Sequence, residues 1–164
     1  MARARTKMPE TKDLVINVTE FACAYSFGSD TEFVRRLKRD WHAIEDHQHL
    51  RLYGTVVAPD AQAGRDMNIV AYVTDRFDNF MGGGLPIDEP LPEVGEFVWG
   101  RARGASIWFP SAESLWNVAH GLRSGLLRHL RLTFKPPMRP FVHIQRFVFE
   151  TPIQPHEAED SDGE

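Results

Sequence analysis

The segment 107–149 constrains the fold most, because the spacing of its apolar residues changes from helical to strand-like within one stretch. After a short apolar run at 107–109, apolar side chains recur at i, i+3, i+4 and i+7, as in an amphipathic helix: Leu115, Val118, Ala119 and Leu122. Ser111 can cap the first turn with its hydroxyl, and Gly125 can end the last turn. The pattern predicts a helix over residues 111–123.

Two strands are expected after this helix. Apolar and polar side chains alternate through 130–134, which is typical of a strand with one face in water. The proline-rich stretch 135–140 cannot carry a ladder, because proline lacks an amide proton. It is therefore a turn or crossing loop, and 141–149 is predicted to be the next strand.

This last strand carries a conflict of parity. Val142 and Ile144 share one face, whereas Phe147 and Phe149 have the opposite parity. A β-bulge near Gln145 reconciles the two pairs, and burial of both faces is the alternative explanation.

The earlier part of the chain adds three strands, a helix and a loop. Residues 14–25 have apolar side chains on both faces, which favours a central strand or one twisted across two layers. A capping-box pattern and apolar residues at four-residue spacing predict a helix at about 30–43. Turn residues between 50–56 and 67–74 predict a hairpin. Residues 77–93 lose all periodicity, and loops of that length are usually functional or mobile.

These elements predict a mostly β (α+β) fold. We expect an antiparallel β-sandwich or two-layer sheet with two helices, at about 30–43 and 111–123. The alternative is a single curved antiparallel sheet with both helices on one face. No regular βαβ alternation is present, which argues against a doubly wound parallel sheet. One globular domain is expected at 13–154, between a flexible basic arm at 1–12 and a flexible acidic tail at 155–164.

The composition indicates a packed core and limits the cellular compartment in which we expect the protein. A hydrophobic content of 42% fits a packed core, and no apolar run approaches the roughly 20 residues of a membrane span. The single cysteine, Cys23, excludes an internal disulfide and is expected to be a small buried hydrophobe. We therefore expect a cytoplasmic protein that does not contact a membrane.

Candidates for catalysis are few. Ser106 lacks the second glycine of a nucleophile elbow, and the triple glycine 82–84 lacks the lysine of a phosphate loop. His47 and His49 are two residues apart, so on a strand both imidazoles would point to one side, as metal ligands can. Their spacing matches no closed zinc pattern, and a polar helix-to-strand connection with solvated histidines is the favoured explanation. The sequence favours a protein without cofactor or catalytic activity.

The charge distribution is the most unusual feature. Residues 60–98 carry a net charge of −6, whereas residues 101–149 carry a net charge of +7. Guanidinium groups on the two closing strands and their loop could bind carboxylate or phosphate in a bidentate way. The candidate binding residues are Arg101, Arg103, Arg128, Arg131, Lys135, Arg139 and Arg146.

Three function classes remain. The leading hypothesis is a non-catalytic protein-interaction module whose basic sheet face binds an acidic protein partner or another copy of itself. The alternative is a nucleic-acid-binding protein that uses the same face, which a pI of about 6.0 disfavours. The third is a metal-dependent enzyme that uses His47 and His49.

Overall fold

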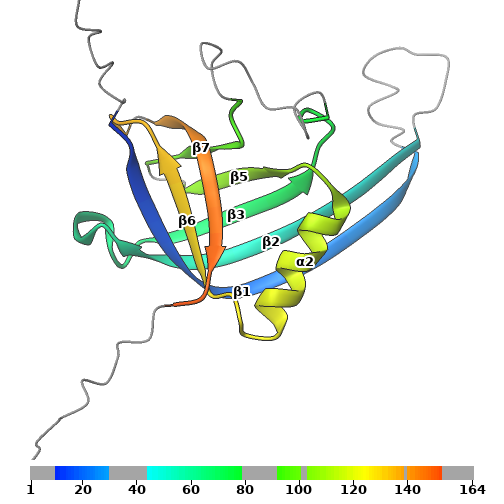
Figure 1. The fold of residues 1–164 in the computed structure, drawn as a ribbon, viewed down its shortest axis with the longest axis horizontal. Helices are drawn as coiled ribbons and strands as arrows, with labels where there is room; N and C mark the ends of the chain where they lie inside the picture. The colour runs from blue at the N-terminus through cyan, green and yellow to red at the C-terminus, as the bar shows by residue number, and fades with distance from the viewer. Residues whose placement is uncertain (1–9, 30–43, 79–91, 101–102, 139, 153–164) are drawn as a thin grey trace, which may run out of the picture.

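The computed structural model describes residues 10–29, 44–78, 92–100, 103–138 and 140–152, and of residues 27–29 and 44–47 it describes the backbone alone. These residues form a closed barrel with the strand order β1-β2-β3-β5-β4-β7-β6 (Figure 1). The strands are β1 (Lys12–Ser29), β2 (Ile44–Ala58), β3 (Asp66–Val73), β4 (Gly95–Val98), β5 (Gly104–Phe109), β6 (His129–Phe134) and β7 (Phe141–Glu150). A 3-10 turn, η1 (Asp60–Gln62), follows β2, and the α-helix is α2 (Ala112–Arg123).

The expected sandwich or two-layer sheet is wrong, and so is the alternative of one curved sheet. β1 pairs with β2 on one side and with β6 on the other, where Leu14 lies opposite Leu132. This pairing closes the sheet into a ring, so that there are no separate layers. Alternation along a strand shows which side chains are buried but does not show whether the sheet closes, which explains the error.

The core fills the inside of the ring. Inward-facing side chains of all seven strands are almost completely buried, including Leu14 and Ile16 on β1 and Leu130 on β6. Phe97 and Phe134 meet edge to face with ring centroids 5.2 Å apart. The barrel is therefore a packed body and not a channel.

The predicted β-bulge in β7 is confirmed. Thr133 of β6 lies opposite Arg146, whereas the next residue, Phe134, lies opposite Ile144, so Gln145 is the extra residue. Beyond this bulge odd-numbered side chains of β7 face inward in place of even-numbered ones. The ring centroids of Phe147 and Phe109 are 5.0 Å apart.

A β-bulge also occurs in β1, where none was predicted. A register shift between Val18 and Glu20 inserts Thr19, so the apolar residues before and after it face the same side of the sheet. Ile16 and Phe21 both pack on the core for this reason. Apart from Val15, which is buried on the opposite face, the apolar residues that suggested burial on both faces thus belong to one face, which continues across a bulge.

Helix α2 is confirmed within one residue of its expected start. The Ser111 hydroxyl accepts a hydrogen bond from the Ser114 amide, and Gly125 ends the turn with a φ of 76°. Leu115 and Leu122 join the barrel core, and α2 contacts β2, β3 and β5 (Figure 1). In the part of the chain that the structure describes, no helix is long and apolar enough to cross a membrane.

One pair of neighbouring strands, β3 and β5, is parallel, whereas only antiparallel pairs were predicted. The β2–β3 hairpin is confirmed, and β4 and β5 are two short antiparallel strands. However, β5 is inserted between β3 and β4, which makes the β3–β5 pair parallel. The predicted helix at 30–43 lies outside the described residues, as do most of the loop 77–93, the arm and the tail.

Candidate interaction site

Arg131, at the centre of the expected basic face, is already neutralised within the chain. Its guanidinium donates a hydrogen bond of 2.7 Å to Glu150 Oε1 and one of 3.3 Å to Asp13 Oδ2. The hydrogen bond with Glu150 raises the pKa of Arg131, desolvation opposes this shift, and Asp13 adds to it. An acidic partner would therefore have to compete with two carboxylates at this position.

Arg103 occupies a different environment. Its guanidinium carbon lies 5.9 Å from the ring centroid of Trp99, and that of Arg65 lies 5.4 Å from the same centroid. The indole is thus a shared cation–π partner of two arginines from different turns. The Nε atom of Arg103 is buried and has no hydrogen-bond partner among the residues that the structure describes.

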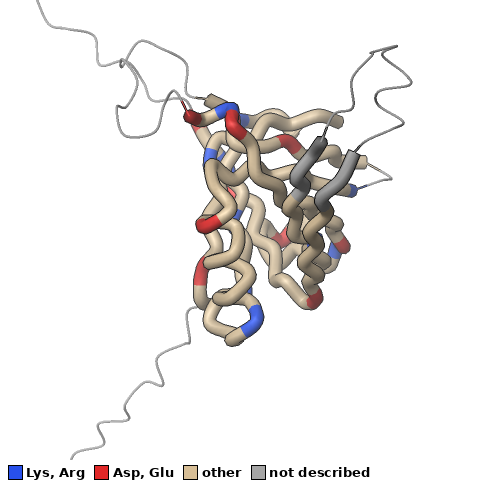
Figure 2. The backbone as a smooth tube through the Cα atoms, turned by 90° about the vertical axis from the view of Figure 1, so that its right-hand side faces the viewer, with Lys and Arg blue, Asp and Glu red and all other residues tan. Residues whose placement is uncertain are grey.

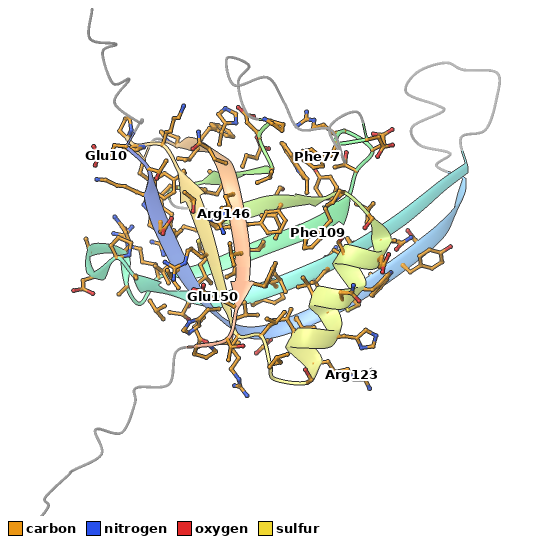
Figure 3. The ribbon with its side chains drawn as sticks, in the orientation of Figure 1. Glu10, Phe77, Phe109, Arg123, Arg146 and Glu150 are labelled. Carbon is orange, nitrogen blue, oxygen red and sulfur yellow. The ribbon has the colours of Figure 1, made fainter. Side chains whose placement is uncertain are left out.

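The other candidates of the basic face are spread over the surface. Arg128, in the turn before β6, donates a hydrogen bond of 3.4 Å to the Gly125 carbonyl. Lys135 follows the opposite end of β6, and the exposed Arg146 lies on β7 (Figure 3). Two candidates lie outside the described residues: Arg101 and Arg139.

Charged residues of both signs are interspersed along the described backbone (Figure 2). Arg123, which also belongs to the basic segment, is the last residue of α2 (Figure 3). His143 Nδ1, on β7, lies 2.9 Å from Glu93 Oε2 on the outer surface of the barrel, so the acidic and basic segments also meet there. The described part of the basic segment is therefore not one continuous surface.

The described part of the structure adds no support to the hypothesis of a metal site at His47 and His49. His47 and His49 lie on β2, but the side chain of His47 is outside the description and His49 is half-buried. Among the described side chains, no group of three His, Cys, Asp or Glu residues could hold a metal ion. A site at His47 and His49 stays a prediction.

The most distinctive feature is the strand edge of β1 beyond the barrel. Pairing with β6 ends at Asn17, and a last hydrogen bond joins the Val18 amide to the Arg128 carbonyl. From there β1 continues to Ser29, where β2 is its only partner among the described strands, and it forms the outermost strand of a long ribbon (Figure 1). We call the side of residues 19–29 that faces away from β2 the β1 edge. Within the described ranges no strand pairs with it.

The side chains of the β1 edge suit contact with another polypeptide. Cys23 is exposed, so the expectation of a buried thiol is wrong: this part of β1 has left the barrel. Tyr25 is 59% exposed, although β-strand aromatics usually pack on a neighbour. Among residues 19–29, Glu20 is the single charged residue.

The ribbon has a second, shorter edge on β2. Pairing of β2 with β3 begins at His49, so residues 44–48 extend past β3. An open groove of about 640 Å³ lies at this corner, between β1, β2 and the end of β3. Its lining includes Ser26, Arg51 and Tyr72. The Trp116 indole of α2 donates a hydrogen bond of 2.8 Å to Gln48 Oε1 and so ties the helix to the base of the ribbon.

Sequence reasoning missed the β1 edge because it selected residues by charge. A signal was present: residues 21–29 contain no charged residue and no proline, and their three aromatic side chains favour strands. Natural edge strands usually carry lysine, proline or a covering element, and none of the first two occurs in 19–29.

Comparison with protein families, with curated proteins and with solved structures found no match for this chain.

Proposed function

We propose that this protein is a non-catalytic protein-interaction module that binds an extended polypeptide along the β1 edge. The observation that carries the proposal is the absence of a strand partner for residues 19–29 on one side of β1, within the described residues. Unpaired amide and carbonyl groups in a preformed strand are a template for an added strand. Main-chain hydrogen bonds then supply the affinity, and alternate side chains supply the specificity.

The β1 edge is a better candidate than the edge of β2. The β1 edge comprises residues 19–29, whereas the edge of β2 beyond β3 comprises residues 44–48. Apart from Glu20, its exposed side chains are uncharged, including those of Tyr25 and Cys23, so a partner would have to desolvate a single ionised group. A long open edge with a single charged residue is a template for strand addition, and it promotes aggregation if nothing covers it.

The charge of the partner is a separate part of the proposal. Exposed cations such as Arg146 and Arg128 would favour an acidic polypeptide over a basic one. The nucleic-acid alternative has weaker support, because Arg131 is paired with carboxylates and the other cations lie on different sides of the barrel. A cytoplasmic location belongs to the proposal as well: an exposed thiol such as that of Cys23 stays reduced there.

Selection from a library of short random peptides displayed on phage tests the proposal without a known partner. We expect enriched peptides to alternate apolar and polar residues, and to shift the NMR amide signals of residues 19–29 on the purified chain. Binding should be lost in Tyr25→Lys, because a lysine on an edge strand opposes strand addition.

The matched control is Tyr53→Lys. Tyr53 is 42% exposed, but it lies on β2, which is paired on both sides at this position. Binding should therefore survive in this variant. Failure to enrich any peptide that shifts residues 19–29, or equal loss of binding in both variants, would contradict the proposed function.

A further inference from the structure

We infer that the polypeptide bound by the β1 edge is the β1 edge of a second copy, in an antiparallel pair centred on Cys23. This inference rests on the proposed function and names its partner. It follows from the side-chain pattern of residues 21–25, aromatic–Ala–Cys–Ala–aromatic, which matches itself when the chain is turned by a two-fold axis at Cys23.

The symmetry of such a pair decides which residues meet. An axis perpendicular to the ribbon makes the two strands antiparallel and keeps each face of the sheet on the same side. Each residue then lies opposite one from the same face. With the axis at Cys23, the two cysteines are opposite each other, and Phe21 of each copy lies opposite Tyr25 of the other.

This register joins the aromatic residues of the edge. Phe21 packs partly on the core of its own barrel, whereas Tyr25 is 59% exposed and has much of its ring surface free. Two aromatic cross-strand pairs would form, one on each side of the axis, and such pairs stabilise antiparallel sheets. An axis at Ala22 or Ala24 would leave Phe21 and Tyr25 unmatched with each other.

The charges of the edge are compatible with the same register. Glu20 is the one ionised residue in 19–29, and the axis at Cys23 places it opposite Ser26. The two Glu20 carboxylates therefore lie near opposite ends of the pair and do not repel each other closely. Ala22 and Ala24 lie opposite each other on the second face, and their small side chains let the two ribbons approach.

The single cysteine of the chain gives a direct readout. Directly opposed residues of an antiparallel pair have Cα atoms about 4.5–5.5 Å apart, a separation that a disulfide accepts. Diamide, which takes up the two electrons and two protons released by two thiols, should convert the full-length chain to a disulfide-linked dimer. Sedimentation of the reduced chain should show the same dimer without the covalent link.

The control for random collision is the double variant Cys23→Ser with Tyr53→Cys. The new thiol is placed at an exposed position of β2, where both sides of the strand are paired. It should form cross-linked dimers far more slowly than the natural chain does. Equal rates at the two positions would overturn the inference.

A second variant tests the pair without cysteine chemistry. Tyr25→Lys should raise the dissociation constant of the reduced dimer by about tenfold or more, because it removes both aromatic pairs and adds two charges. Tyr53→Lys should leave the constant unchanged. A monomer at all concentrations, or a dimer that is insensitive to Tyr25→Lys, would overturn the inference. Peptide binding at the β1 edge by a monomeric chain would overturn this inference alone and leave the proposed function standing.

Discussion

The two halves of β1 have the same kind of sequence and different surroundings. In the barrel half, residues 12–17, the strand is paired on both sides, and Leu14 and Ile16 are 0% exposed. In the half beyond the bulge, residues 19–29, it is paired on one side, and Tyr25 is 59% exposed. Burial in this chain is thus set by which strands meet β1, and not by the hydrophobicity of β1 itself.

The boundary between the halves is built by two residues. Thr19 is the extra residue of the bulge, and its hydroxyl donates a hydrogen bond of 3.2 Å to the Tyr53 carbonyl. Gly54, opposite Val18, lets the two strands approach closely where β1 bends. Residues 12–17 contribute buried side chains to the core, whereas residues 19–29 carry exposed side chains such as Tyr25.

The largest effect is expected for a truncation in the barrel half. Ile16→Ala removes a fully buried side chain from the core, which should lower the free energy of unfolding by about 3 kcal/mol. Urea denaturation followed by tryptophan fluorescence measures this. A loss below about 1 kcal/mol would show that the barrel half is not the rigid part of β1.

A smaller effect is expected where the halves join. In Gly54→Ala the new Cβ would lie 2.5 Å from the Asn17 carbonyl oxygen and 2.6 Å from Ile16 Cγ2. One of these neighbours must shift, at a cost of about 2 kcal/mol in unfolding free energy. Gly100→Ala is the control, because no atom of the described residues lies within 4 Å of the Cβ it would add. Equal stability of the two variants would contradict the close approach.

Arg131 tests the ion pairs that attach the barrel half to β6 and β7. Arg131→Met should cost about 1 kcal/mol or less, since the side chain is 37% exposed and solvent screens both pairs. The pKa of Arg131 is raised in the folded state, so its contribution is complete at lower pH and is lost only in strong alkali. The difference between variant and natural chain should therefore stay constant from about pH 6 to about pH 9, whereas Arg146→Met should show no difference.

The smallest effect on stability is expected beyond the barrel. Tyr25→Ala should change the unfolding free energy of the isolated chain by about 0.5 kcal/mol or less, because the ring is mostly in water. The measurement must be made at a concentration where the chain is monomeric. A large loss would mean that Tyr25 supports its own barrel and is not available to a second chain.

Local features of the fold could be predicted from the sequence. The limits of α2 followed from Ser111 and Gly125, and the bulge of β7 followed from the parity of its phenylalanines. The same conflict in β1 was interpreted as burial on two faces, because a strand buried on both sides produces the same pattern. The bulge at Thr19 becomes visible only when the pairing with β2 is known.

Features that depend on distant partners could not be predicted. Closure of the barrel joins β1 to β6, and Asp13 reaches Arg131 and Thr133 across most of the chain. A net charge summed over a segment does not show that Asp13 and Glu150 neutralise Arg131. The basic residues were therefore recognised as a group in sequence, although the fold distributes them over several sides.

The β1–β6 closure also has a consequence for synthesis of the protein. At roughly 5–20 residues per second on the ribosome, β6 emerges on the order of ten seconds after β1. Until then β1 can hydrogen-bond to β2 alone, so both of its halves expose an open side to other nascent chains. The pairing between copies inferred above would therefore have a longer open edge during synthesis than in the finished barrel.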